Sequence, residues 1–548
     1  PEITADGSDV EINTWPPKAH TMTTFAKRVE HSDIVHFLNF TNTDDLTWRD
    51  VNGTRQAPEV KTGITVTVKA KHPVGKVWVA SPDIDGGAVR ELPFEQNGNG
   101  VTFTIPSVEY WTMAVLEDKP VDDNVFITGD GVQADGQEDA WALKDGIQMI
   151  KGDNGVFTAT AYIKAGKPFK FATVSNKSIN SNHNFEWYYC NSFNAEYENF
   201  EFKPGFNSAN VLYKDGKDYK YTVSEDANYD ITLDTQNMRI TVDKSAYQDT
   251  RADRYPALYL VGAKGNWSLS QAVPVVPTDL SKPYIISTEL PIEKGNDFKF
   301  ATNTIDEYWS QTMFGMGESA DKMALIDSND RKWVAPNDGY YFITLNKLTN
   351  EVSIESQTSV NIGSTGYATY CFGKPIDWKA VTGVKAYAAV GTSSKTPTNG
   401  AAANDGQTTT ITMRQLDLSS PGTGMILHGA QGTYTLPFCK DNGAVADNLL
   451  KGVLEATDIK GKDNGHTNYI LANGDDGVGF YPAKDGTLAA NKAYLSLPMQ
   501  TSGAKAIMMD FGNGTTAINA TAANCCSNTK TQDYDLTGTC IPCDAKGM

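Results

Sequence analysis

The stretch Ile163–Thr173, with the sequence IKAGKPFKFAT, returns as Ile292–Thr302, with the sequence IEKGNDFKFAT, and the two align without a gap. In each copy one lysine, Lys170 or Lys299, stands between two phenylalanines. Alternate residues of a strand point to opposite faces of its sheet. Both copies therefore predict a strand whose phenylalanines enter a core and whose lysine stands on the other face.

Further landmarks recur around the repeat in the same order. Each copy follows an apolar run that ends in glycine, Gly129 or Gly262, and precedes a closing hairpin of two apolar runs. Two tryptophans flank each copy. Trp141 and Trp187 flank the first copy, and Trp267 and Trp309 flank the second. Landmarks that recur in one order indicate a duplicated module.

The pattern favours binding of a carbohydrate. Sugar rings stack their C–H faces on flat aromatic surfaces, and a lysine donates hydrogen bonds to hydroxyl groups. The alternative is structural: the tryptophans would belong to a sandwich core, and the lysines would be solvated residues on a strand face.

The order of strand, glycine, tryptophan, FKF, tryptophan and hairpin resembles the tandem starch-binding modules of SusE- and SusF-type outer-membrane lipoproteins of Bacteroidetes, over about residues 120–357. In that family the aromatic platform and the lysine contact α-glucan. The resemblance nominates Trp141, Lys170 and Trp187 in the first module and Trp267, Lys299 and Trp309 in the second. A long insertion between Trp187 and Tyr229 makes the first module depart from the second, which favours the second site.

Composition limits the fold and the partners. The 548 residues include 47 basic and 66 acidic side chains, a formal net charge of −19, which would repel nucleic acid and anionic membranes and suits a neutral partner. Short Val, Ile, Tyr and Phe runs between turn residues predict a mainly β chain of four tandem β-sandwich-like domains, without a catalytic barrel. No apolar stretch reaches the length of a transmembrane helix. The acidic start lacks signal-peptide character, and we expect the chain to begin inside a longer polypeptide.

Four segments are predicted, and their bounds are 1–119, 120–250, 251–357 and 358–548. In the first, Met22–Val29 is expected to form a short helix that precedes a series of strands in a two-sheet sandwich. The polar stretch Ser245–Arg254 between the two modules predicts that they can reorient. The first and last segments are expected to lack an aromatic binding platform.

The first segment carries a second resemblance. Its motifs are Asn13–Pro17, His36–Phe40, Trp48–Asp50, Val79–Asp83 and Pro106–Trp111. They resemble the β-sandwich that follows the catalytic (β/α)₈ barrel in glycoside hydrolase family 66, which contains dextranases and cycloisomaltooligosaccharide glucanotransferases. The resemblance implies that the barrel lies upstream of Pro1. No position here matches its catalytic motifs, so no catalytic residue is predicted.

The last segment resembles a β-rich accessory domain found at the C-termini of large secreted Bacteroidetes proteins, followed by a truncated terminal tail. Its end holds four of the seven cysteines, and the adjacent pair Cys525-Cys526 is a poor geometry for zinc. We predict no metal site and no cofactor.

Together these observations predict the α-glucan-binding accessory part of a secreted, dextranase-like glycoside hydrolase. A stand-alone surface glycan-binding protein of a SusE/SusF-like uptake system is the alternative. A weaker third possibility is an adhesion module in residues 358–548. The sequence leaves the glucan linkage and the oligomeric state open.

Overall fold

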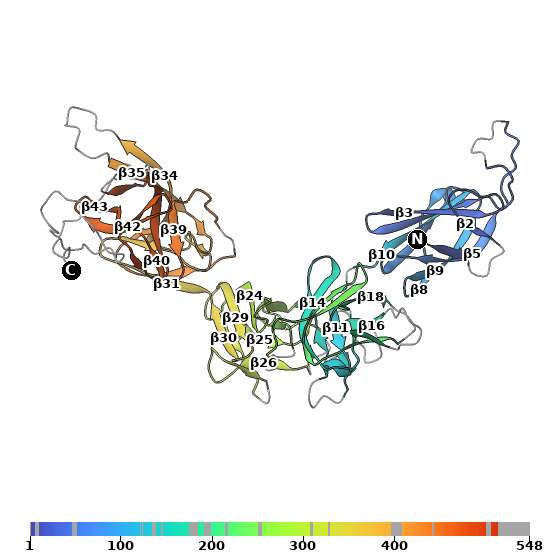
Figure 1. Cartoon of the computed structure of the whole chain (residues 1–548), viewed down its shortest axis with the longest axis horizontal. Helices are drawn as coiled ribbons and strands as arrows, with labels where there is room; N and C mark the ends of the chain where they lie inside the picture. The colour runs from blue at the N-terminus through green and yellow to red at the C-terminus, as the bar shows by residue number, and fades with distance from the viewer. Residues whose placement is uncertain are drawn as a thin grey trace. The chain divides into compact units, whose positions relative to one another are not determined.

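A computed structural model describes residues 2–512 except 6–9, 47–51, 121, 123, 134–138, 144–145, 175–184, 191–198, 214–217, 250–254, 307–308, 310, 327–328, 396–407, 441–442 and 500–505. The regular elements in these residues are strands and short 3-10 helices (Figure 1), which confirms the mainly β prediction. Within the same residues, no helix has the length and apolar character needed to span a membrane.

The chain forms two compact units. The first contains Pro1–Thr288, Asn296–Val334 and Thr344–Val352, and the second contains Glu289–Gly295, Ala335–Ile343 and Ser353–Met548.

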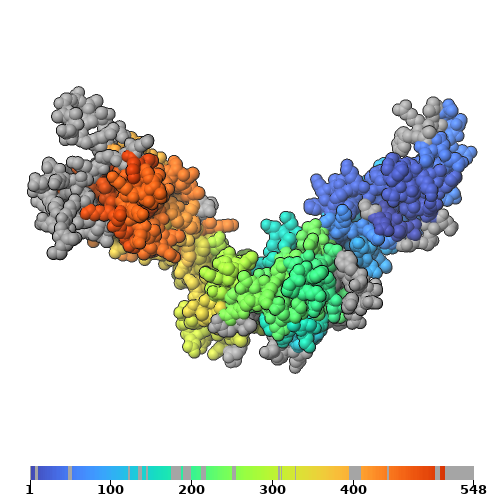
Figure 2. All heavy atoms as spheres, viewed as in Figure 1, coloured from blue at the N-terminus to red at the C-terminus, as the bar shows by residue number. Residues whose placement is uncertain are grey.

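The first segment folds as a sandwich of two sheets, blue in Figure 2. One sheet has the order β1-β5-β9-β8 and the other β2-β3-β4-β10-β6-β7. The strands are β1 (Ile3–Ala5), β2 (Ile12–Thr14), β3 (Met22–Val29), β4 (Ser32–Asn39), β5 (Lys61–Lys69), β6 (Val74–Ala80), β7 (Arg90–Leu92), β8 (Phe94–Asn97), β9 (Gly100–Val108) and β10 (Trp111–Asp118), with the 3-10 turn η1 (Asp85–Gly87). Inward-facing residues of both sheets, among them Phe37, Val66 and Phe103, form one buried core.

The helix predicted for Met22–Val29 is wrong, because these residues form β3. Along its whole length β3 pairs antiparallel with β4, from Met22 opposite Asn39 to Val29 opposite Ser32. Two consecutive threonines, which are β-branched, favour a strand, and tertiary pairing outweighs the helix propensity of the remaining residues.

The first module is a nine-stranded sheet that curls around its own core, in the order β12-β11-β15-β16-β18-β21-β20-β14-β13, with a separate pair β17-β19. The strands are β11 (Asn124–Thr128), β12 (Ile147–Gln148), β13 (Ile150–Lys151), β14 (Val156–Ile163), β15 (Lys170–Val174), β16 (Phe185–Cys190), β17 (Asn199–Phe202), β18 (Ser208–Tyr213), β19 (Lys220–Val223), β20 (Ala227–Asp234) and β21 (Arg239–Lys244), with turns η2 (Asp130–Val132) and η4 (Asp153–Gly155). The first FKF repeat leads into β15, which lies between β11 and β16 in the sheet.

The second module repeats this plan with fewer strands, in the order β27-β26-β25-β22-β23-β24-β29-β30, and β28 also pairs with β25. Its elements are β22 (Leu258–Val261), η5 (Leu269–Gln271), β23 (Val273–Pro277), β24 (Ile285–Ile292), β25 (Asp297–Ala301), β26 (Met313–Met316), β27 (Met323–Leu325), β28 (Trp333–Val334), β29 (Gly339–Asn346) and β30 (Glu351–Glu355). In both modules the phenylalanines of the repeat are buried, as the alternation predicts.

The last segment is built on a ten-stranded sheet with the order β32-β37-β34-β35-β46-β43-β42-β45-β39, to which β41 adds at β42. Three strand pairs, β31-β38, β33-β36 and β40-β44, accompany it. The strands are β31 (Gln357–Ile362), β32 (Tyr367–Tyr370), β33 (Ile376–Asp377), β34 (Val384–Lys395), β35 (Thr408–Leu416), β36 (Leu418–Ser419), β37 (Met425–Gly429), β38 (Gly432–Pro437), β39 (Leu450–Val453), β40 (Thr457–Ile459), β41 (Lys462–Asp463), β42 (His466–Gly474), β43 (Gly477–Pro482), β44 (Gly486–Leu488), β45 (Lys492–Pro498) and β46 (Ile507–Asp510). The predicted C-terminal tail and its cysteines lie outside the described residues.

Candidate functional site

In the first module, the lysine of the FKF repeat lies against both predicted tryptophans. The Nζ atom of Lys170 is 4.1 Å from the ring centroid of Trp187 and 5.3 Å from that of Trp141. The two indole rings meet edge to face, with centroids 6.3 Å apart and planes inclined by 68°. Strand β15 holds the lysine, and β16 places Trp187 opposite Ala172 of β15. The fold therefore brings together the three residues nominated from the sequence.

An acidic residue that sequence analysis missed completes this cluster. Lys170 Nζ donates a hydrogen bond to Asp218 Oδ1 at 2.5 Å, and Lys220 Nζ donates to Asp218 Oδ2 at 2.7 Å. Lys220 also lies over Trp141, at 5.8 Å from the ring centroid. We call Trp141, Lys170, Trp187, Asp218 and Lys220 the first cage.

The second module contains the same arrangement around Trp267. Lys299 Nζ and Lys332 Nζ lie 5.6 Å and 5.0 Å from the Trp267 centroid. Asp330 joins the two lysines, with Oδ1 3.0 Å from Lys299 and Oδ2 3.4 Å from Lys332. We call Trp267, Lys299, Asp330 and Lys332 the second cage. A tryptophan, two lysines and one aspartate thus recur in both modules.

The lysines of the repeat are not solvated. Lys170 is 5% exposed and Lys299 is 8% exposed. Burial lowers the pKa of Lys170 more than the hydrogen bond and charge of Asp218 raise it. The solvated-lysine alternative is therefore wrong for both modules. An ammonium group under an indole ring and against a carboxylate is satisfied by cation–π and charge-assisted contacts.

The carboxylates are the parts of these pairs that solvent reaches. The side chains of Asp218 and Asp330 are 62% and 45% exposed. For both, burial acts to raise the pKa, but the hydrogen bonds and charges of the two lysines outweigh it and lower the pKa. Each cage therefore presents an ionised carboxylate, which accepts hydrogen bonds, beside an indole ring.

The glycine that ends the strand before each cage supports the tryptophan. Gly129 and Gly262 have positive φ values of 124° and 97°. A Cβ atom at Gly129 would lie 2.8 Å from the Trp141 ring, and one at Gly262 would lie 2.9 Å from the Trp267 ring. Such a Cβ would also collide with a backbone oxygen, of Pro168 or Asp297 respectively. Only glycine leaves room for the indole on the backbone at these positions.

Trp187 and Trp309 do not occupy equivalent positions, although they follow the repeat in the same order. Trp187 lies opposite Ala172, and the residue opposite the matching Ala301 is Met313. Trp309 instead lies in the loop before β26 and is 44% exposed. The structure therefore joins Trp267 and Lys299 directly and leaves Trp309 as an exposed ring in a loop.

A buried junction joins the two modules within the first unit. Thr304 donates from its backbone N–H to Gln148 Oε1 at 2.9 Å and from its hydroxyl to Asn124 Oδ1 at 2.8 Å. The next residue, Ile305, is fully buried in a cluster of first-module residues against which Trp187 also packs. These contacts join the two modules within the first unit. That the polar linker lets the modules reorient stays a prediction.

The first sandwich carries a row of aromatic rings of a different kind. Phe25 and His36 stack with centroids 4.4 Å apart and planes 17° apart, and His36 stacks on Trp111 at 5.7 Å and 22°. His36 is covered on both faces by its neighbours, so only the rings at the ends of the row have an outer face left.

Among the described residues, no cluster of three or more His, Cys, Asp or Glu side chains is arranged to hold a metal ion.

Comparisons with known proteins relate the first segment to a family. Residues 1–115 match the model for glycosyl hydrolase family 66. Two curated relatives from Niallia circulans, each a cycloisomaltooligosaccharide glucanotransferase, match with 32% identity over 173 residues and 31% over 105 residues. The matches cover 30% and 18% of this chain and 16% and 10% of the relatives, so the chain spans less than a fifth of their length.

Two solved structures are also similar. A Paenibacillus cycloisomaltooligosaccharide glucanotransferase complexed with cycloisomaltoheptaose aligns with 29% identity and a TM-score of 0.19, over 21% of this chain and 16% of its own. SusF from Bacteroides thetaiotaomicron aligns with 13% identity and a TM-score of 0.18, over 80% of this chain and 98% of its own. Both families named from the sequence are represented among these relatives.

Proposed function

We propose that the two cages bind α-glucan, of the dextran or starch type, and that the chain is the accessory part of a secreted, dextranase-like glycoside hydrolase. The observation that carries the proposal is the duplicated cage, in which an indole ring lies beside an ionised carboxylate. A pyranose ring has an apolar C–H face and a rim of hydroxyl groups. The indole accepts the face, and Asp218 or Asp330 accepts hydrogen bonds from the rim.

The buried lysines have a positioning role in this proposal. Each holds its aspartate in place and lies against the indole ring, so the ring and the carboxylate keep one relative geometry. Preorganisation of this kind reduces the entropy lost on binding. The more exposed partners, Lys220 and Lys332, are the lysines able to reach a sugar hydroxyl.

Relatives support the chemical class of the ligand. Two of them are named cycloisomaltooligosaccharide glucanotransferases, and isomaltooligosaccharides are α-glucans. The alternative function, a stand-alone surface glycan-binding protein like SusF, would use the same cages in the same way. The two functions differ in whether a catalytic domain accompanies the chain.

Isothermal titration tests the cages. The full chain is titrated with maltooligosaccharides and isomaltooligosaccharides, and compared with Trp141→Ala, Trp267→Ala and Trp309→Ala. Loss of one stacking ring is expected to cost about 1–3 kcal/mol, by analogy with bases stacked on aromatic side chains. That is roughly a tenfold loss of affinity or more.

Trp78→Ala, a partly buried tryptophan of the first sandwich, is the matched control and should bind like the wild type. Unchanged affinity in Trp267→Ala, with the fold intact by circular dichroism, would remove the second cage from the proposal. Absence of glucan binding by the wild type would overturn the proposal as a whole.

A further inference from the structure

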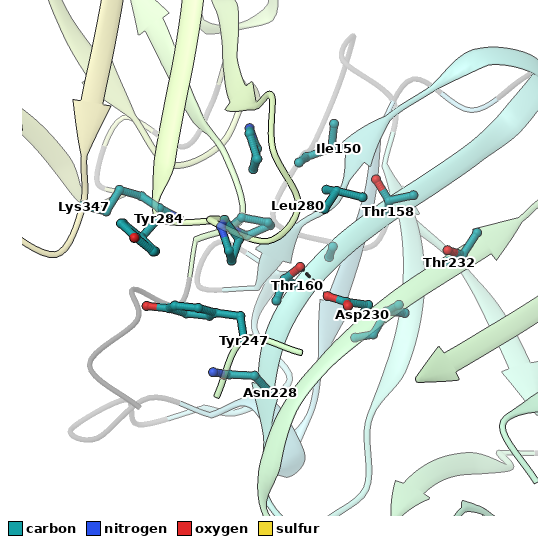
Figure 3. Close-up of a pocket in the computed structure, with 15 residues that line it drawn as sticks. Ile150, Thr158, Thr160, Asn228, Asp230, Thr232, Tyr247, Leu280, Tyr284 and Lys347 are labelled. Carbon is teal, nitrogen blue, oxygen red and sulfur yellow. Dashed lines mark hydrogen bonds between the residues drawn. The ribbon is translucent and has the colours of Figure 1, made fainter. Parts of the chain in front are cut away.

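A third concave site lies at the junction of the two modules, away from both cages. It is a hollow of about 130 Å³ in the first unit, and none of the residues that line it belongs to a cage. Both modules contribute to its wall, with β14 and β20 on one side and Tyr247, Tyr284 and Lys347 on the other (Figure 3).

The wall formed by the first module includes a polar group of side chains. Thr160 lies opposite Asp230, and Thr158 lies opposite Thr232, in the antiparallel pair β14-β20. Side chains directly opposite one another in such a pair share a face of the sheet. Thr160 donates its hydroxyl hydrogen to Asp230 Oδ1 at 2.7 Å, as the dashed line in Figure 3 shows. Three hydroxyl groups and a carboxylate therefore face the hollow.

The opposite wall is aromatic and apolar. The rings of Tyr247 and Tyr284 lie 5.4 Å apart with planes inclined by 35°. Prolines 256, 277 and 283 line the hollow beside them. Leu280 also lines it and is 71% exposed, a large apolar side chain that water reaches. The hollow is thus apolar on one side and rich in hydrogen-bonding groups on the other.

This division matches one kind of ligand. The carboxylate of Asp230 disfavours an anion, and the Lys347 ammonium, which donates to the backbone oxygen of Tyr255, disfavours a cation. A neutral ring with an apolar face and a hydroxyl rim satisfies both walls.

We propose that this hollow is a third carbohydrate subsite, which takes a single hexopyranose unit against Tyr247 and Tyr284, with hydroxyl groups hydrogen-bonded to Asp230 and the threonines. The subsite rests on the proposed function only for the identity of the polymer. Its sugar-binding chemistry is independent of the cages.

The test uses the full-length chain with both cages disabled, as the double variant Trp141→Ala/Trp267→Ala. Ligand-observed saturation-transfer NMR with glucose, maltose and isomaltose measures the binding that remains. We expect weak binding to persist in the double variant. Adding Tyr284→Ala should weaken it about tenfold, the loss typical of one stacking ring. Adding Asp230→Asn should weaken it about tenfold as well, because hydrogen bonds to a charged group are lost.

Tyr110→Ala, which removes an exposed tyrosine of the first sandwich, is the control and should leave the remaining binding unchanged. If Tyr284→Ala fails to fold, Asp230→Asn decides, because it keeps the shape of the side chain while it removes the charge and replaces one acceptor oxygen with an amide donor.

The outcomes separate the two proposals. Glucan binding by the wild type and none by the double variant would overturn the subsite and leave the cages standing. Equal binding by the wild type and the double variant, abolished by Asp230→Asn, would establish the subsite and overturn the cages. Remaining binding that neither Asp230→Asn nor Tyr284→Ala weakens would overturn the subsite.

Discussion

At the scale of single residues, each cage depends on a glycine that carries no chemistry of its own. Gly129 and Gly262 leave space for an indole ring directly over the backbone. The ring then meets a lysine that the neighbouring strand presents, and the lysine holds an aspartate. The geometry of each cage therefore depends on a residue that offers no functional group to a ligand.

Gly262→Ala should displace Trp267 and weaken the second cage. The added Cβ meets both the ring and the backbone oxygen of Asp297, in a backbone conformation that alanine adopts at a cost of about 1–3 kcal/mol. We expect an affinity loss for glucan similar to that of Trp267→Ala, measured by titration.

Gly295→Ala is the matched control for this prediction. Its φ is also positive, at 87°, but no atom lies within 4 Å of the added Cβ. An equal loss of affinity in both alanine variants would show that backbone strain, and not the support of the indole, explains the effect.

A histidine in the first sandwich should make its local stability depend on pH. Burial lowers the pKa of His36, and Trp111 donates its indole N–H to His36 Nδ1 at 3.1 Å. The unfolded chain thus binds a proton more readily than the folded one. The stabilisation is complete above the ordinary histidine pKa of about 6.5 and is lost as the pH falls through the folded-state value.

Hydrogen exchange in β3, β4 and β10 should therefore accelerate between pH 7 and 5, after correction for the intrinsic rate. His36→Phe should reduce this acceleration, whereas His31→Gln, at an exposed position of the same sandwich, should not. An identical pH dependence in His36→Phe and the wild type would contradict the assignment.

At the scale of elements, local sequence patterns predicted which residues form strands better than they predicted which side chains come into contact. The alternation around Lys170 and Lys299 correctly predicted buried phenylalanines on either side of each lysine. Strand β3 has no such alternation: its burial falls from the buried Met22 at one end to the exposed Val29 at the other, so the pattern did not identify a strand. In β15 and β25 the alternation placed the phenylalanines, but it did not show that the lysines between them are buried as well.

The aspartates of the two cages, which sequence analysis missed, became apparent only in the fold. Asp218 follows Lys170 by 48 residues and Asp330 follows Lys299 by 31, because the first module contains an insertion. Each is the start of an Asp-x-Lys sequence, and this repeated signal was available. Chain order also suggested that Trp187 and Trp309 are equivalent, but strand register decides equivalence.

Ile305 is the element-scale test of the junction between modules. Its side chain is fully buried against first-module residues, and truncation of a buried isoleucine costs about 2–5 kcal/mol. Ile305→Ser should accelerate hydrogen exchange in β11 and β15 of the first module. Leu325→Ser, at a 64% exposed position of the second module, should not. Unchanged exchange in Ile305→Ser would mean that the modules do not depend on this contact.

At the scale of the whole molecule, the chain should bind glucan without cleaving it. Glycoside hydrolysis needs two carboxyl groups that face each other across a sugar, and one of them must act as an acid. In each cage the lysines lower the pKa of the carboxyl group. The group is therefore ionised at neutral pH and holds no proton that it could donate as an acid.

Purified chain incubated with dextran or starch should release no reducing sugar above the blank, and an active dextranase serves as the assay control. Release that persists after repeated purification would contradict the prediction and would direct attention to carboxylates outside the cages.

The glycine beneath each indole has a consequence for the divergence of such modules. Gly129 and Gly262 face backbone oxygens as well as rings, so selection for folding alone preserves them. Trp267 also packs on the core of its module, so only its exposed surface is left to selection for the proposed ligand. In a lineage of duplicated modules, we therefore expect the glycine to outlast the tryptophan in a copy that no longer binds glucan.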